Sequence, residues 1–404
     1  MILNKKFRDV VLSKVVKPGE HSVGIEVESI IFTNNGKRLP VHSKKELSSA
    51  KIIQILKENN GKSGEFSLEP GGQIEWSSNP YRNLNDLENA IKVQNKIFYK
   101  VLNKNNLKII PYGVDPFYSP ENLDLIKQKK YQLMDKHMER SGTMGKWMMR
   151  CTSSIQVNFD FTSLKEMEEM VFIADALHPV ASFIFSNSPL KNGKKTGKKN
   201  IRHLIWGNTD NFRCNNLIDH DISSPIGLMD NYIRFLYKVP GIFQLDREKK
   251  IERTTKTLGG RVSSLLKNGE LKDYDIQAAL HQIFTNVRIK NLVEVRGSDR
   301  TPIDFEIAPA AFWTGILLDQ KIRIRIIKIL KNWTLEDRKI FNKCAKILDF
   351  NQLGPQNKSF REWISIIGKI SMEGLEKRNL NEVHLFKNFF DIVMEKGPFG
   401  LQNQ

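Results

Sequence analysis

The sequence predicts an α+β fold, because segments with the two-residue period of β-strands alternate with segments that have the 3.6-residue period of helices. The chain has 404 residues, of which 40% are hydrophobic and 27% charged. That composition is typical of a globular protein with a sizeable core. The sequence contains no repeat period and no long low-complexity tract. One large domain or two closely packed domains would fit this length.

The predicted helices form the scaffold. Apolar residues in the segment 87–102 lie on one helical face. Ser163 and Glu166 have the spacing of a capping box before a second helix. Two further helices are expected over residues 310–331 and 362–378.

Four predicted strands carry their polar side chains on one side only. Because side chains alternate along a strand, Glu26 and Glu28 in VGIEVES share a face, about 7 Å apart. The strands GGQIEWS, SIQVNFDF and LVEVRGSD repeat the pattern. The polar positions of the four strands are Glu26 and Glu28, Gln73 and Glu75, Gln156, Asn158 and Asp160, and Glu294 and Arg296.

These polar faces favour a magnesium site. Any one of the strands could instead lie on an ordinary water-facing sheet surface, which is the simpler interpretation. Such a surface usually mixes threonine and lysine with acids, whereas these faces carry mainly carboxylates and amides. Neighbouring carboxylates repel one another, so a cluster of them is best explained by a cation. Magnesium takes oxygen ligands and keeps waters and substrate phosphates in its shell.

The charge of the chain favours anionic partners. It has 63 basic and 45 acidic residues, a net charge of +18. ATP, amino-acid carboxylates, nucleic acid and a membrane surface would all fit, and a general lysine-rich composition would explain the charge without any partner. No nucleic-acid-reading motif is recognisable, although a nucleic-acid-binding protein remains the alternative that the charge suggests. The sequence contains no run of about 18 apolar residues that could span a bilayer, and its start lacks the apolar core of a secretory signal. We therefore expect no membrane partner and a cytoplasmic location.

Several other kinds of site are excluded by their missing signatures. The segment GKKTGKK at 193–199 lacks P-loop spacing, and no HExxH or GxSxG motif occurs. Histidines 178 and 281 are expected to pack or to donate hydrogen bonds. Cys151, Cys214 and Cys344 are too few and too scattered for a disulfide framework or a zinc site, so we expect reduced thiols and no disulfide regulation.

The lysine-rich segment 189–200, PLKNGKKTGKKN, is predicted to be a loop. A solvated surface loop is the simpler interpretation. A lid that covers the phosphates of a nucleotide is the alternative, and it predicts that neutralising the lysines raises the KM for ATP.

A series of motifs follows in order along the chain. They are GIEVES at 24–29, SLEPGGQIEWS at 67–77, KYQLMDKHMERSGTMGKWMM at 130–149, IQVNFDF at 155–161, FSNSPL at 185–190, RHLIWGNTDNFR at 202–213, IFTNVRIKNLVEVRGSD at 283–299, PAAFWTGILLD at 309–319 and GLEKR at 374–378. Together they resemble the glutamate-cysteine ligases of the plant and proteobacterial type. The resemblance covers nearly the whole chain, and SLEPGGQ and IQVN are its most specific parts.

The resemblance implies a glutamine synthetase-like fold, in which a curved, mainly antiparallel sheet forms a funnel with helices packed outside it. It also implies a single catalytic domain over residues 1–404. The implied magnesium ligands are Glu26, Glu28, Glu75 and Glu294, with Glu69 and Gln156 near the ATP phosphates. Arg296 would meet the transferring phosphate and, with Glu294, count as catalytic. Arg202 would pair with the α-carboxylate of glutamate, and the implied further substrate contacts are Asn158, Trp206 and Tyr232.

The reaction that the resemblance implies is the first step of glutathione synthesis. The γ-carboxylate of L-glutamate would be phosphorylated by ATP and then joined to the amine of L-cysteine, with Mg²⁺ as the cofactor. The alternative is a ligase that joins glutamate to a different amine. A monomer or a homodimer is expected, with no nucleic-acid partner.

One segment departs from the family pattern. Family members commonly read MMxRTxxVQVN, whereas this chain reads MMRCTSSIQVN, with Arg150 one position early and Cys151 where the arginine is expected. In a strand this shift changes the face of the side chain, so either a bulge or a change of role is expected. Arg150 is therefore a candidate substrate-binding residue.

Overall fold

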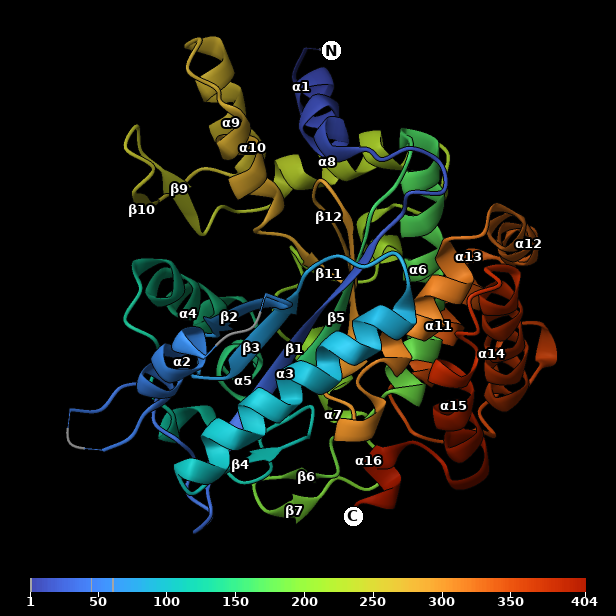
Figure 1. Cartoon of the computed structure of the whole chain (residues 1–404). Helices are drawn as coiled ribbons and strands as arrows, with labels where there is room; N and C mark the ends of the chain where they lie inside the picture. The colour runs from blue at the N-terminus through green and yellow to red at the C-terminus, as the bar shows by residue number, and fades with distance from the viewer. Residues whose placement is uncertain (1, 45, 60–61) are drawn as a thin grey trace.

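A mainly antiparallel sheet lies at the centre of the protein, and helices surround it (Figure 1). The computed structural model describes residues 2–44, 46–59 and 62–404. The strands of the main sheet are β1 (Val23–Thr33), β2 (Gly64–Leu68), β3 (Ile74–Ser78), β4 (Leu107–Ile110), β5 (Ser154–Phe159), β12 (Val287–Ile289) and β13 (Val293–Asp299). They run in the order β12-β13-β5-β1-β3-β2, with β4 also paired to β1, and every pairing is antiparallel. The predicted fold class is confirmed.

Shorter strands pair outside this sheet. They are β6 (Leu190–Lys191) with β7 (Lys194–Lys195), β9 (Phe243–Leu245) with β10 (Ile251–Arg253), and β8 (Cys214–Asn215) in parallel with β11 (Phe284–Thr285).

The helices differ widely in length. They are α1 (Ile2–Val11), α2 (Ser49–Glu58), α3 (Leu84–Lys104), α4 (Lys129–Ser141), α5 (Gly145–Cys151), α6 (Leu164–Ile184), α7 (Ile201–Gly207), α8 (Leu228–Lys238), α9 (Leu258–Lys267), α10 (Asp273–Leu280), α11 (Ala308–Leu317), α12 (Gln320–Lys331), α13 (Leu335–Cys344), α14 (Phe360–Lys377), α15 (His384–Lys396) and α16 (Phe399–Gln402). Within the described residues, none combines the length and the apolarity needed to cross a bilayer.

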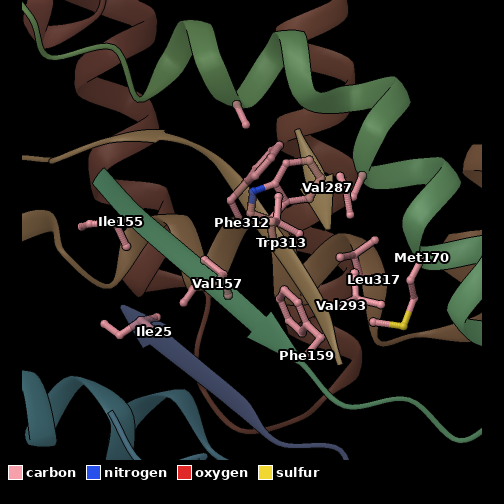
Figure 2. Close-up of a cluster of buried hydrophobic side chains, with 14 of the residues drawn as sticks. Ile25, Ile155, Val157, Phe159, Met170, Val287, Val293, Phe312, Trp313 and Leu317 are labelled. Atoms are coloured by element: carbon pink, nitrogen blue, oxygen red, sulfur yellow. The ribbon is translucent and has the colours of Figure 1, made fainter. Parts of the chain in front are cut away.

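One face of the sheet packs against α6 and α11. Ile25 of β1 lies opposite Val157 of β5, which in turn lies opposite Val295 of β13, so the registers line up an apolar row across three strands. Figure 2 shows this side, where Val157 and Val293 lie near Trp313 of α11 and Met170 of α6. Because strand side chains alternate, the polar residues of the same strands must lie on the opposite face.

The start of α6 differs in part from the predicted capping box. Ser163 Oγ accepts a hydrogen bond from the Glu166 backbone N–H at 3.2 Å, as expected. The Glu166 carboxylate does not return to Ser163. It accepts from the Thr162 backbone N–H at 2.7 Å and forms ion pairs with His21 and Arg323. The Thr162 backbone, together with the tertiary partners His21 and Arg323, replaces the Ser163 backbone as the partner of this carboxylate.

The helix predicted over residues 310–331 is two helices, so that prediction is wrong. Helix α11 ends at Leu317, and Asp319 accepts a hydrogen bond from the Ile322 backbone N–H at 2.8 Å as the N-cap of α12. Helix α11 is buried on all sides, whereas α12 buries one face. The helices predicted at 87–102 and 362–378 are confirmed as parts of α3 and α14.

Arg150 lies in helix α5, so the strand predicted around it is wrong. Its guanidinium forms a bidentate ion pair with Asp135 of α4, with both Nη2–O distances at 2.7 Å. It also donates to the carbonyls of Pro120 and Leu123 at 3.1 and 2.9 Å. The N–H groups of the planar guanidinium donate to all of these partners. Arg150 therefore connects α5 to α4 and to the segment 120–123.

Close backbone contact between α11 and α14 depends on two glycines. A β-carbon at Gly374 would lie 1.8 Å from the Gly315 carbonyl oxygen, and one at Gly315 would lie 2.0 Å from the Ser371 carbonyl oxygen. Neither opposing atom belongs to a side chain that could rotate away. The two helices can approach this closely only without side chains at these positions.

We therefore expect Gly374→Ala to lower the free energy of unfolding by about 1–3 kcal/mol, because the added methyl group forces the two backbones apart. Chemical denaturation would measure the change. Gly207→Ala is the matched control, since its β-carbon would meet only the Asn215 side chain at 4.0 Å. Equal effects of the two substitutions would contradict this view of the helix contact.

Candidate active site

Two cavities lie beside the polar face of the sheet. The first, here the carboxylate cavity, has a volume of about 260 Å³. The second, here the basic cavity, has a volume of about 350 Å³. Trp206, Phe284 and Arg296 line both, so the cavities meet at these three side chains.

Four glutamates form one wall of the carboxylate cavity: Glu26, Glu28, Glu69 and Glu75. Glu28 of β1 lies opposite Glu75 of β3, and Glu26 follows the two-residue period of the same strand. Glu69 comes directly after β2. The strand pairing therefore places the predicted carboxylates together.

The electrostatics of this wall show that its negative charges are crowded. Burial and the neighbouring Glu28 raise the pKa of Glu69 to about 7. Burial and the carboxylates of Glu69, Glu26 and Glu28 raise the pKa of Glu75 well above its usual value. The pKa of Glu28 is also raised, chiefly by burial, although Arg202 and Arg296 oppose the shift. The folded chain holds these groups where ionisation is unfavourable without a cation.

The wall fits magnesium by its donor chemistry. Within the described residues, no three histidine, cysteine, aspartate or glutamate side chains are already arranged to hold a metal ion. The carboxylates are hard oxygen donors, and a divalent cation would relieve their repulsion. Magnesium in ATP-using sites takes only one or two carboxylates and completes its shell with waters and phosphates, so a full cage is not required.

Glu294, the fourth predicted magnesium ligand, has a different environment. Its side chain is fully buried and does not line the cavity. Its carboxylate forms ion pairs with Arg288 at 2.7 Å, with Lys290 and with Arg296. Burial favours the neutral acid, but these three cations hold the pKa of Glu294 well below its usual range. The carboxylate oxygens are already used by protein cations.

Gln156 links Arg296 to the carboxylate wall through two hydrogen bonds. Its guanidinium donates to the Gln156 side-chain oxygen at 2.6 Å, and the Gln156 amide donates to Glu28 at 3.0 Å. Gln156 thus holds an arginine on one side and a carboxylate of the cavity wall on the other. This arrangement fixes a positive charge where the two cavities meet.

The basic cavity contains Arg202 as its deepest cation. Only 4% of the Arg202 surface is exposed, and one of its terminal nitrogens donates to the Arg296 carbonyl at 3.3 Å. Its Nε has no hydrogen-bond partner among the described residues. The guanidiniums of Arg202 and Arg296 lie 5.8 and 5.4 Å from the centre of the Trp206 ring. The charged residues that line this cavity are Arg202, Arg296, Lys339, Lys343, Lys346 and Asp219.

Three predicted substrate contacts line neither cavity. Tyr232 is fully buried in the hydrophobic core on α8, beside Phe235, so the structure brings it to neither cavity. Arg150 lines neither cavity, because its guanidinium is used by Asp135. Asn158 is on the polar face but donates its amide to Glu26 at 3.0 Å and lines neither cavity. Its predicted role therefore reduces to orienting Glu26.

The lysine-rich segment 189–200 does not line either cavity. It forms the β6–β7 hairpin, and Lys191 lies 3.9 Å from the centre of the Trp147 ring. Lys198 pairs with Asp349 at 2.9 Å, and the Gly197 N–H donates to Gln404 at 3.1 Å. These contacts support the simpler interpretation as a surface loop and give the lid hypothesis no support.

Sequence reasoning missed several residues of the cavities. Arg288 and Lys290 line the carboxylate cavity together with Lys130 of α4. The first two alternate with Val287 and Ile289 in VRIK, so their two-residue period was visible in the sequence. His178 and His203 line the basic cavity with ring centres 5.9 Å apart, and no local pattern predicts that position.

The three cysteines are buried and unbonded, as expected for reduced thiols. Burial raises the pKa of Cys214 to about 12 and that of Cys344 to about 11. Burial also raises the pKa of Cys151. None of them is an activated nucleophile.

Comparison with solved structures supports the same fold. The crystal structure of a glutamate-cysteine ligase from Francisella tularensis, determined in complex with AMP, aligns with a TM-score of 0.54 and 12% identity. The alignment covers 96% of this chain and 84% of that protein. At this identity the likeness concerns the fold alone.

Comparison of sequences identifies the family. Glutamate-cysteine ligase A of Oryza sativa subsp. indica, a chloroplastic protein, is 30% identical over 357 residues, which cover 85% of this chain and 71% of the relative. The chloroplastic glutamate-cysteine ligase of Arabidopsis thaliana is 29% identical over 340 residues, which cover 82% of this chain and 63% of the relative. The model of glutamate-cysteine ligase family 2 matches residues 22–347, most of the chain. With its carboxylate wall and its predicted motifs in place, this chain belongs to glutamate-cysteine ligase family 2.

Proposed function

We propose that the protein joins the γ-carboxylate of L-glutamate to the amine of L-cysteine at the expense of ATP, the first step of glutathione synthesis. Family membership supports this activity, as do the names of its relatives. The observation that carries the proposal is structural: Glu26, Glu28, Glu69 and Glu75 converge with Arg296 on one cavity. A site of this kind suits phosphoryl transfer, where catalysis consists mainly of positioning and charge neutralisation.

Mg²⁺ is the proposed cofactor. Glu26, Glu28 and Glu75 would hold it, with Glu69 beside them, because their carboxylates line the cavity and repel one another. When bound, the ion supplies positive charge that offsets the negative charge of the ATP phosphates.

The chain's own residues have separate tasks in this proposal. Arg296 lies where the cavities meet and would contact the transferring phosphoryl group. Arg202, which lines the basic cavity, would pair with the α-carboxylate of glutamate. Trp206 lies against both guanidiniums and limits their movement.

The proposed chemistry has two steps. An oxygen of the glutamate γ-carboxylate attacks the terminal phosphorus of ATP, the bond to ADP breaks, and an acyl phosphate forms. The cysteine nitrogen then attacks the acyl carbon, phosphate leaves, and the nitrogen loses a proton. The phosphate is needed because a free carboxylate would have to expel oxide.

An ADP-release assay tests the activity. We expect release that requires glutamate, ATP and cysteine together, with a γ-glutamylcysteine product confirmed by mass spectrometry. Other amines should give far less product at equal concentration. Faster turnover with another amine would instead establish the related ligase with a different acceptor, and no ADP release with any acceptor would refute the proposal.

Substitutions of Glu75 and of Glu294 should have different effects on the stability of the protein. Glu75→Gln should abolish activity but leave the melting temperature unchanged or raised, because it removes repulsion within the carboxylate wall. Glu294→Gln should abolish activity and, in addition, lower the free energy of unfolding by about 3–5 kcal/mol, since three partly buried cations lose their buried partner. Differential scanning calorimetry and the ADP-release assay would measure both, and equal melting temperatures for the two variants would contradict the distinction.

Magnesium alone should stabilise the protein more at high pH. The folded-state pKa of Glu69, about 7, exceeds the ordinary value of 4.5, so folding favours the protonated acid, and its contribution to stability is lost as the pH rises between these values. A bound cation would reverse that loss, because it requires the ionised carboxylate. The rise in melting temperature on adding Mg²⁺ should therefore be larger at about pH 8 than at about pH 5.5.

Glu69→Gln provides the control for this measurement. The variant cannot ionise at this position, so its response to Mg²⁺ should depend less on pH than that of the wild-type protein. A response to Mg²⁺ that is the same at both pH values in the wild-type protein would argue against metal binding at the carboxylate wall.

A further inference from the structure

One buried carboxylate collects three cations at the hairpin of β12 and β13. Arg288 of β12 lies directly opposite Glu294 of β13, and Lys290 follows β12. Arg296 lies two residues beyond Glu294 on the same face. All three cations pair with Glu294, which has no exposed surface. We call Arg288, Lys290 and Arg296 the cation cluster.

The cation cluster has more positive charge than Glu294 can neutralise. The buried carboxylate lies behind it, and Arg288, Lys290 and Arg296 themselves line the carboxylate cavity. Their side chains are 12–16% exposed, so the charges are close to the cavity without being solvated freely. A surplus of partly desolvated positive charge attracts an anion strongly.

The neighbouring Lys130 adds a further positive charge to this cavity. Burial is the main cause that lowers the pKa of its ammonium group; Arg288 and Lys290 add to that shift by like-charge repulsion, and Glu69 and Glu75 oppose it. Lys130 reaches the cavity from α4, on a different part of the fold. The β12–β13 hairpin and helix α4 therefore both bring positive charge to the cavity that contains the four-glutamate wall.

The two sides of the cavity together match a metal-bound polyphosphate. The glutamate wall suits a divalent cation, and the cation cluster suits oxygens of high negative charge. Each carboxylate of an amino-acid substrate carries one negative charge, whereas the two terminal phosphates of ATP carry several charged oxygens close together. Arg288 offers a planar guanidinium suited to two phosphate oxygens, and Lys290 offers a compact point charge.

We propose that Arg288 and Lys290 bind the two terminal phosphates of ATP, and that Glu294 serves as the positioning residue that holds both cations, with Arg296, towards the cavity. This inference rests on the proposed ATP-dependent reaction and names two phosphate-binding residues for it. Glu294 acts through the cations and makes no contact with the nucleotide.

Direct binding measurements test the assignment. The probes are the Mg²⁺ complex of the β,γ-imido analogue of ATP and, separately, AMP, each titrated into the full-length protein by calorimetry. Arg288→Met and Lys290→Met should each weaken the triphosphate analogue about tenfold or more, because a charge-assisted contact to a phosphate is lost. The affinity for AMP should remain within about twofold of the wild-type value, because AMP lacks the two terminal phosphates.

Two further variants act as controls. Arg247→Met removes an arginine that also pairs with a glutamate, Glu270, but is exposed and lines neither cavity, so binding of both probes should be unchanged. Lys290→Arg keeps the charge and should retain most of the affinity for the triphosphate analogue. An unchanged triphosphate affinity in both methionine variants would overturn the proposal, and so would an equal loss of AMP and triphosphate binding.

The binding measurements and the ligase assay can fail independently of each other. If the wild-type protein releases ADP with glutamate and cysteine while both methionine variants bind the triphosphate analogue normally, the ligase activity stands and the phosphate assignment falls. If the wild-type protein binds the triphosphate analogue through these residues but forms no γ-glutamyl product, the assignment stands and the acceptor chemistry falls.

Discussion

The pairing of β1 with β5 on one side and β3 on the other determines where the charge of the site lies. Each register aligns apolar residues with apolar residues, as with Ile25 opposite Val157, because that face packs against α6 and α11. A shift of one residue would bury Glu26 and Glu28 in the core, which is energetically prohibitive. The hydrophobic packing behind the sheet therefore fixes the carboxylates in front of it.

The site keeps opposite charges apart although they share a cavity. Glu294 satisfies the cation cluster from behind, so Arg288 and Lys290 do not turn towards the glutamate wall. Burial, followed by repulsion among the carboxylates, raises the pKa values of Glu28, Glu69 and Glu75, and the cations of the site offset these shifts only in part. A carboxylate wall and a cation cluster that only partly compensate each other suit a ligand that brings both a cation and phosphates.

The meeting of two cavities at Arg296 gives the proposed reaction its geometry. Phosphoryl transfer to a carboxylate requires two anionic reactants in contact, and a fixed guanidinium between them reduces their repulsion. Gln156 and Glu294 hold Arg296 from two sides, and the Trp206 ring packs near it. Separate compartments joined at one cation allow the nucleotide and the amino acid to bind independently and still react.

By itself, the sequence determined the strands, their polar faces and the family. The alternation in VGIEVES and LVEVRGSD follows from backbone geometry alone, so the common face of Glu26, Glu28, Glu75 and Arg296 was predictable. Only the tertiary structure decided which polar residues reach a cavity. Tyr232 and Arg150 were assigned by resemblance, yet neither lines a cavity, because Tyr232 is buried in the core and Arg150 pairs with Asp135. Glu294 and Glu75 look alike in sequence, but their surroundings separate their roles. The β12–β13 hairpin folds Arg288 and Lys290 back onto Glu294, whereas strand pairing brings Glu75 opposite Glu28, which is far away along the chain.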